Sequence, residues 1–283
     1  MRAKQLYEQL EKDFIKPEFT DEWAKYMESI SDFLTENFKK RSMGLVCNFA
    51  EEVNNVYTAV FPSNNVMKKV LEDGAKDAML FVHHPSIWDI RKAPDIFYQM
   101  DRELLKKFKE MNVSIYNLHV PLDNHGEYST AVSLARALKI ETEKPFAPYY
   151  GCMSGVIGKV GTKNLQNLKK AFESAVGHKV VLYEYGKDEI KGGKVGIVAG
   201  GGNSVENLKE LSEEGINVFI SGVTVKNDRS REAHDFAESN RINILGGTHY
   251  STEKFACIAI CDYFKKLGIP SEFIKDEPMM EDM

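Results

Sequence analysis

The sequence predicts an α/β fold made of two similar α/β domains. Two stretches, residues 53–82 and residues 193–223, each read as strand, helix and strand. Their segments "KKVLEDGAKDAMLFV" and "LKELSEEGINVFISG" align at the end of the helix and in the strand that follows. This weak internal duplication indicates two related α/β halves.

The N-terminal segment, residues 1–42, is predicted to be a helical extension. One apolar stripe at helical spacing ends at Phe14, and a second runs from Trp23 to Phe38, with Pro17 between them. Such helices pack on a core or on a partner subunit, and we expect no chemistry in them.

The first strand–helix–strand unit opens with "VNNVYTAVF", which is rich in β-branched and apolar residues. A helix opened by Ser63 or Asn64 and closed near Gly74 follows, and then "DAMLFV" reads as a buried strand. Another helix leads to a strand over Val113–Leu118. Pro121 then predicts an extended or turned segment rather than a helix.

The second unit contains "GGGNS", which lacks the full G-x-G-x-x-G spacing and therefore reads as a tight turn rather than a dinucleotide site. A strand over Ile242–Leu245 leads through two glycines to a long amphipathic helix, with Phe255, Ile258 and Phe264 expected on its buried side. The closing "EPMMEDM" reads as a loose acidic tail unless an interface holds it.

Composition excludes several classes of protein. The formal net charge is −5 and no long basic run occurs, so direct nucleic-acid binding is not expected. No apolar stretch approaches the roughly 20 residues that span a bilayer, and the first residues lack the apolar segment of a signal peptide. We expect a cytoplasmic protein without a membrane partner. Its four cysteines are too few and too scattered for a disulfide framework. Cys257 and Cys261, four residues apart in an apolar helical pattern, are predicted to be buried thiols rather than thiolate metal ligands, since no C-x-x-C occurs.

Histidines gather where three predicted strands end. The strand "AMLFV" runs into the first histidines, "VSIYNL" into the next, and "INILGG" leads to the last. The residues concerned, with the carboxylates that accompany them, are His83, His84, His119, Asp123, His125, His249 and Glu253. Ligands of open α/β sheets bind beyond the carboxyl ends of the strands, so we expect these side chains to share one edge.

Imidazoles mixed with carboxylates suit zinc, iron or manganese. His249 and Glu253 lie four residues apart at a helix start and can face one point. Each feature alone has an ordinary alternative. Tandem histidines occur on surfaces and in cores, Asp123 can be a turn residue, and Glu253 can be a favourable charge in a first helical turn. Their shared placement at strand ends favours a metal site.

Three ordered motifs, "VHHPSIW", "YNLHVPLDNHGEYSTAVSLARAL" and "GGTHYSTEKFA", resemble those of the Nif-three-like dinuclear metal-centre family, often labelled GTP cyclohydrolase I type 2 homologues. "GLVCNFAEEV" also resembles its early glycine-leucine segment. The resemblance runs from Met43 to Ile274. It implies two similar α/β domains related by pseudo-symmetry, two divalent metal ions in the cleft between them, and a ring-shaped homohexamer. We accordingly expect a first domain over residues 43–128 plus 232–283 and a second over 129–231.

Carried over by motif, the metal ligands are His83, His84, Asp123, His249 and Glu253. His119 matches a histidine beside the family's site, where it ligates or acts from the second layer. The chain also departs from the family. "KRSMGL" replaces a tryptophan-aspartate-asparagine triplet, and "ISGVTVKND" replaces a more acidic stretch.

The leading functional hypothesis is a metal-dependent hydrolase of a small nucleotide-like or phosphorylated substrate, with His119 or His125 passing a proton to the leaving group. Action on GTP rests on the family label alone. The alternative is a non-enzymatic metal-binding or regulatory module that acts through protein partners. A further hypothesis, a transcriptional partner, follows from the family's naming. An open coordination position separates a catalytic site from a structural one.

Overall fold

The computed structural model describes residues 1–283 and divides into two compact units. Unit 1 consists of Met1–Leu122, Tyr150–Cys152 and Cys257–Glu277; unit 2 consists of Asp123–Tyr149, Met153–Ala256 and Pro278–Met283. The expected domain boundaries differ from this division. Residues 232–256, expected in the first domain, belong to unit 2 because their strand pairs with the strand that ends at Ser221.

Unit 1 contains a five-stranded sheet in the order β1-β6-β3-β2-β13. β6, β3, β2 and β13 are parallel, and β1 is antiparallel to β6. The strands are β1 (Gly44–Cys47), β2 (Asn55–Ala59), β3 (Ala78–Val82), β6 (Val113–Asn117) and β13 (Ser271–Phe273), and a short hairpin is formed by β4 (Ile87–Trp88) and β5 (Phe97–Tyr98). The predicted strand–helix–strand unit is present.

Helices cover both faces of this sheet because residues of the buried strands alternate between them. On β3, Leu80 and Val82 lie in a core with Phe108, whereas the Phe81 ring packs against Phe264 with centroids 5.6 Å apart. The helices of unit 1 are α1 (Ala3–Phe14), α2 (Glu36–Arg41), α3 (Asn64–Glu72), α4 (Arg102–Glu110) and the C-terminal part of α10 (His249–Lys266). Burial of each such aromatic side chain contributes roughly 1.5–3 kcal/mol.

The N-terminal segment is less regular than predicted. After α1, the second apolar stripe lies on two 3-10 turns, Trp23–Tyr26 and Glu28–Phe33, and only then on α2. The side chain of Thr35 caps α2 by accepting the N–H of Phe38, so the helix starts afresh there. The stripe is nevertheless buried in the core of unit 1, as the apolar spacing predicts.

Unit 2 contains a six-stranded sheet in the order β7-β8-β10-β11-β12-β9. β10, β11 and β12 are parallel; β8 and β9 run antiparallel to their neighbours. The strands are β7 (Glu141–Tyr149), β8 (Cys152–Lys159), β9 (Val181–Tyr183), β10 (Lys194–Val198), β11 (Val218–Ser221) and β12 (Asn243–Gly246).

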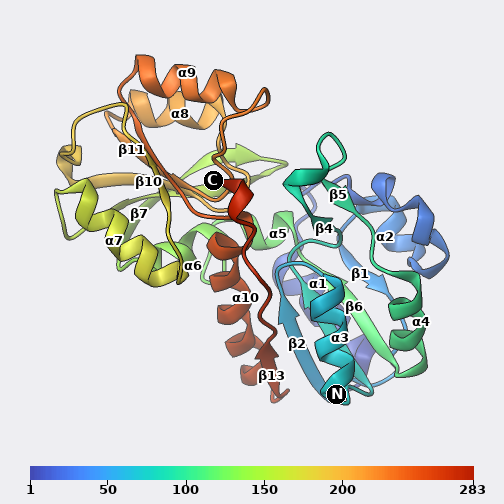
Figure 1. Cartoon of the computed structure of the whole chain (residues 1–283). Helices are drawn as coiled ribbons and strands as arrows, with labels where there is room; N and C mark the ends of the chain where they lie inside the picture. Colours follow the sequence, from blue (N-terminus) through green and yellow to red (C-terminus); the bar gives the residue numbers. More distant parts are fainter. The chain divides into compact units, whose positions relative to one another are not determined.

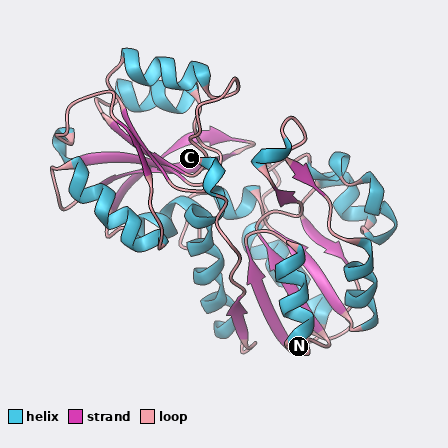
Figure 2. Ribbon diagram, in the orientation of Figure 1, coloured by secondary structure: helices cyan, strands magenta, loops and turns pink.

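Two hydrophobic cores lie on the two faces of the unit 2 sheet. On β11, Val218 and Ile220 face the core that includes α6 and α7, and Phe219 faces the core that includes α8 and α9. Figures 1 and 2 show the strands of this unit between these two helix layers. The helices are α6 (Thr130–Ala137), α7 (Leu165–Val176), α8 (Val205–Glu213), α9 (Arg231–Ser239) and the N-terminal part of α10. The short helix α5 (Val120–Asp123) belongs to unit 1 up to Leu122, and its last residue, Asp123, belongs to unit 2.

The unit boundary falls inside α10, after Ala256. The predicted buried side of this helix is partly wrong: Phe264 is fully buried, but Ile258 is 44% exposed. Cys257 and Cys261 occupy buried positions instead. None of the helices has the length and the apolar character that crossing a membrane requires.

Candidate metal centre

The tandem histidines continue the β3 strand beyond its carboxyl end. The backbone N–H of His83 donates to the carbonyl of Ala59 at 3.1 Å, and that of His84 donates to the carbonyl of Val60 at 2.9 Å. Both imidazoles are buried, with exposed fractions of 0% and 2%. A buried imidazole costs free energy unless its nitrogens have hydrogen-bond or metal partners.

Backbone contacts set the tautomer of His83. Its Nδ1 lies 3.1 Å from the carbonyl oxygen of Leu118. A carbonyl only accepts, so Nδ1 carries the proton and the lone pair of the neutral ring lies on Nε2. Asn117, at the end of β6, donates its side-chain N–H to the carbonyl of His83. This arrangement is typical of a metal-binding histidine, whose second nitrogen is held by a backbone carbonyl.

His119 joins this pair from the neighbouring strand. β3 and β6 are parallel neighbours, so their carboxyl ends meet at one edge of the unit 1 sheet. One ligand atom from each of His83, His84 and His119 lies within 4.8 Å of the others. We call these three residues the unit 1 histidine group. The expectation of a single edge is correct for this group and wrong for His249, because β12 belongs to the other sheet.

The N-terminal segment contacts His119 directly. A carboxylate oxygen of Asp21 and the indole nitrogen of Trp23 each lie 2.9 Å from its Nδ1. The Trp23 ring also meets the ring of His84 edge-on, with centroids 5.5 Å apart. The segment packs in the core of unit 1, as expected, and in addition it supplies polar contacts to a buried histidine.

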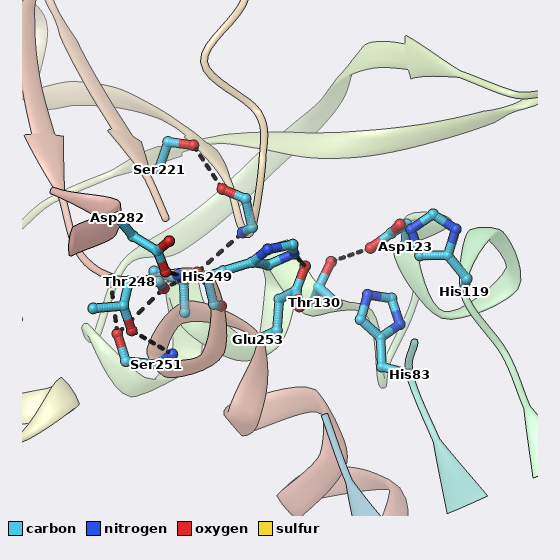
Figure 3. A network of polar contacts seen from close by, with 12 residues as sticks. His83, His119, Asp123, Thr130, Ser221, Thr248, His249, Ser251, Glu253 and Asp282 are labelled. Atoms are coloured by element: carbon cyan, nitrogen blue, oxygen red, sulfur yellow. Dashed lines mark hydrogen bonds and ion pairs between the residues drawn. The ribbon is translucent and has the colours of Figure 1, made fainter. Parts of the chain in front are cut away.

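Asp123 lies in a helical turn that was not expected. Residues Val120–Asp123 form the short helix α5, and the N–H of Leu122 donates to the carbonyl of His119. Pro121 is tolerated because it lies in the first turn, where a backbone N–H has no partner within the helix. In unit 2, the hydroxyl of Thr130 donates to Oδ1 of Asp123 at 2.8 Å and orients the buried carboxylate (Figure 3).

His249 is the first residue of α10, and Glu253 lies one helical turn later on the same face. Thr248 and Ser251 cap this helix reciprocally, each side-chain oxygen accepting the backbone N–H of the other residue (Figure 3). Nε2 of His249 lies 3.2 Å from Oε1 of Glu253. Two ligands that are each about 2.1 Å from one ion lie roughly 3–3.5 Å apart. The spacing of these two atoms therefore suits a shared cation.

Two further residues of unit 2 hold this pair in place. The carboxylate of Asp282 accepts the backbone N–H of His249 at 2.9 Å (Figure 3). Gly200, which has φ +65°, lies so close to the pair that a Cβ there would be 2.0 Å from Oε1 of Glu253 and 3.0 Å from Nε2 of His249. The backbone of the β10–α8 loop thus forms a close wall behind the two ligand atoms.

The residues fit a divalent metal by their chemistry. Imidazole nitrogens and carboxylate oxygens together bind zinc, iron and manganese, and the predicted ligands are all nine-tenths or more buried. Within each unit, neighbouring groups orient them: a backbone carbonyl for His83, a hydroxyl for Asp123 and a second carboxylate for the backbone of His249.

His125 differs from the other candidates. It is exposed, on the loop after α5, and its backbone N–H donates to the carbonyl of Met153 at 2.9 Å. His119 is buried. A catalytic role for His119 or His125 stays a prediction.

Sequence reasoning missed four residues that support the candidate ligands: Asp21, Trp23, Gly200 and Asp282. The tail expected to be loose ends in a 3-10 turn over Met280–Asp282, and Asp282 is completely buried. Its carbonyl also accepts the N–H groups of Thr224 and Val225. No local pattern marks such residues, because their contacts are distant in sequence.

Comparison with known proteins identifies relatives over most of the chain. The family Duf34/NIF3 (NGG1p interacting factor 3) matches residues 20–278. A protein of Pyrococcus horikoshii named GTP cyclohydrolase 1 type 2 homolog is 31% identical over 84% of this chain and 90% of its own length. One of the same name from Archaeoglobus fulgidus is 29% identical, over 89% of this chain and 96% of its own.

Solved structures share the fold. A protein titled ybgI, of unknown function, superimposes with a TM-score of 0.74 at 20% identity, covering 99% of this chain and 100% of its own. Reduced HcgD from Methanocaldococcus jannaschii gives a TM-score of 0.67 at 20% identity, covering 98% of each chain. The match of the family over more than nine-tenths of the sequence leads to one conclusion: the chain belongs to the Duf34/NIF3 family.

Proposed function

We propose that this protein is a metal-dependent hydrolase that acts on a small nucleotide-like or phosphorylated substrate with two divalent cations per chain. The proposed ligands are His83, His84, Asp123, His249 and Glu253. The observation that carries the proposal is the pairing of His249 Nε2 with Glu253 Oε1 at 3.2 Å, both side chains being buried. The unit 1 histidine group supplies the remaining imidazoles.

Divalent cations held by these residues would supply Lewis acidity and would bring the pKa of a bound water down to about 7. The protein's own side chains would then accept or donate protons and keep other water molecules away from the substrate. Nδ1 of His119 faces Asp21 and Trp23, so Nε2 is the nitrogen that it presents. Nε2 is proposed either to accept or donate a proton or to bind one of the cations, and the two roles exclude each other. His125, exposed on its loop, is the second candidate for delivering a proton to a leaving group.

A GTP cyclohydrolase-like reaction is the sharper form of the proposal. It takes its support from the name of the Pyrococcus horikoshii and Archaeoglobus fulgidus relatives. Metal-loaded protein incubated with GTP should release formate, and metal-free protein should not. Absence of both formate and ring-opened product would remove the reaction on GTP.

The hydrolase proposal itself needs a wider assay. Protein reconstituted with Mn²⁺, Zn²⁺ or Fe²⁺ should hydrolyse at least one member of a panel of nucleotides and phosphate esters. The His249→Ala variant and the chelated protein should lose this activity together. Metal bound at full stoichiometry with no turnover of the panel would favour a metal-binding or regulatory module instead.

A homohexameric ring also belongs to the proposal, as the family resemblance implies. Light scattering coupled to size-exclusion chromatography measures it directly, since six chains of 32.1 kDa differ clearly from one or two. The cytoplasmic location stays a prediction from the sequence.

A further inference from the structure

Two neighbours of His119 require opposite protonation states of its Nδ1 atom. Asp21 Oδ2 and Trp23 Nε1 both lie 2.9 Å from Nδ1 of His119. An ionised carboxylate only accepts hydrogen bonds, so Asp21 requires a proton on Nδ1. An indole N–H only donates, so Trp23 requires a lone pair on the same nitrogen. One tautomer satisfies only one of these two contacts.

Burial and charge decide which of the two contacts to Nδ1 of His119 is satisfied. The side chains of His119 and Asp21 are 7% and 6% exposed. The other oxygen of Asp21 accepts the backbone N–H of Glu22 at 2.8 Å, so His119 provides the second hydrogen bond to this carboxylate. A buried carboxylate loses far more than a neutral indole when a hydrogen bond is removed, and bonds to charged acceptors are about twice as strong as neutral ones.

We infer that Asp21 is a positioning residue that holds His119 as the Nδ1–H tautomer, against the competing demand of Trp23. The lone pair of His119 then lies on Nε2, as it does in His83. In the unit 1 histidine group, whose ligand atoms lie within 4.8 Å of one another, His119 thereby becomes a third imidazole able to bind a cation. That last step rests on the proposed function; the tautomer does not.

The pairing also gives the N-terminal segment a role. Asp21 precedes the 3-10 turn that begins at Trp23, and that turn packs into the core of unit 1. The turn fixes Trp23 edge-on to both His84 and His119, with centroids 5.5 Å and 5.1 Å apart. A carboxylate–histidine pair of this kind fixes the tautomer and the orientation of the ring.

Nitrogen NMR of histidine-labelled, metal-free protein tests the tautomer without any cation. The His119 signals are assigned by their absence in a His119→Gln variant. The wild type should show a protonated Nδ1 and an unprotonated Nε2. Asp21→Ala should reverse the two, because Trp23 then donates to Nδ1, whereas Trp23→Phe should leave the wild-type pattern. A protonated Nε2 in the wild type, or an unchanged pattern in Asp21→Ala, overturns the inference.

Zn²⁺ titration of the same proteins tests the consequence. Asp21→Ala should weaken Zn²⁺ binding about 10- to 100-fold. Asp32→Asn is the matched control, because Asp32 is a carboxylate of the same segment that pairs with Arg102 rather than with a histidine. Equal affinity in Asp21→Ala and wild type overturns the role of Asp21 in binding. If the wild type binds no Zn²⁺, the proposed function fails, and the NMR result still decides the tautomer.

Discussion

The carboxylate of Asp282 accepts the backbone N–H of His249, 33 residues earlier in the sequence, at a distance of 2.9 Å. The bond satisfies one of the N–H groups that a helix start leaves without a partner, and it places a negative charge at the positive end of α10. A residue of the acidic tail thus fixes the first residue of the helix that carries His249 and Glu253.

The Asp282→Ala variant should therefore lose about 1 kcal/mol of stability, as capping residues do. Metal binding by His249 and Glu253 should weaken as well, because the first turn of α10 loosens. Chemical denaturation and metal titration measure the two effects. Glu281→Ala is the control, since Glu281 is exposed. Unaltered stability and affinity in Asp282→Ala would show that the cap does not position the ligands.

Gly200 provides a second test of the His249–Glu253 pair. In Gly200→Ala the new Cβ would lie 2.0 Å from Oε1 of Glu253, on a backbone with φ +65°. The left-handed backbone alone costs a non-glycine residue roughly 1–2 kcal/mol. We expect the Glu253 carboxylate to be displaced and metal affinity to fall at least as far as in Glu253→Gln.

The neighbouring glycine is the matched control for that experiment. A Cβ at Gly201 would meet nothing within 4 Å. Gly201→Ala should therefore bind metal like the wild type in the same titration. If both alanine variants bind metal equally well, the loop is not the close wall that the structure describes.

His234 makes stability depend on pH away from the candidate ligands. Burial lowers the pKa of His234 below its ordinary value of 6.5. Its Nε2 donates to the carbonyl of Thr224 at 2.8 Å, and its Nδ1 accepts from the hydroxyl of Tyr185 at 2.9 Å. The folded protein therefore favours the neutral ring.

The sign of the effect follows from linkage. The unfolded chain takes up a proton at the ordinary pKa, before the folded chain does, so stability is present above that pH and falls as the pH drops toward the lowered pKa. Denaturation curves between pH 8 and about pH 5 should show this loss in the wild type. His234→Gln should lose less stability over the same window. Identical slopes would contradict a neutral buried His234.

Much of the fold is readable from local patterns. The strand β3 and the helix α3 follow from a buried apolar run and from Ser63, whose side chain accepts the N–H of Val66 as a cap should. The reciprocal cap of Thr248 and Ser251 is equally local. The buried apolar run of β3 also predicts that the tandem histidines follow the end of a strand.

What the sequence could not provide are pairings between distant segments. Nothing near Asp21 indicates that it meets His119, 98 residues later, and nothing in the acidic tail singles out Asp282. The membership of β12 in the unit 2 sheet is equally non-local, because strand pairing depends on register with β11 and not on the strand's own residues. The helical turn at Pro121 is not predictable for a different reason: proline breaks a helix in its interior but suits a first turn, and the local sequence does not distinguish the two positions.

The central proposal is that His83, His84, Asp123, His249 and Glu253 hold two cations per chain. Metal analysis of the purified protein tests it most directly. Elemental analysis after loading with Mn²⁺ or Zn²⁺ should give two equivalents per chain in the wild type. His83→Ala and His249→Ala should each lose metal, and the double variant should retain none. A wild-type chain that stays metal-free, with the same thermal stability in the presence and absence of Zn²⁺, Fe²⁺ or Mn²⁺, would contradict the account.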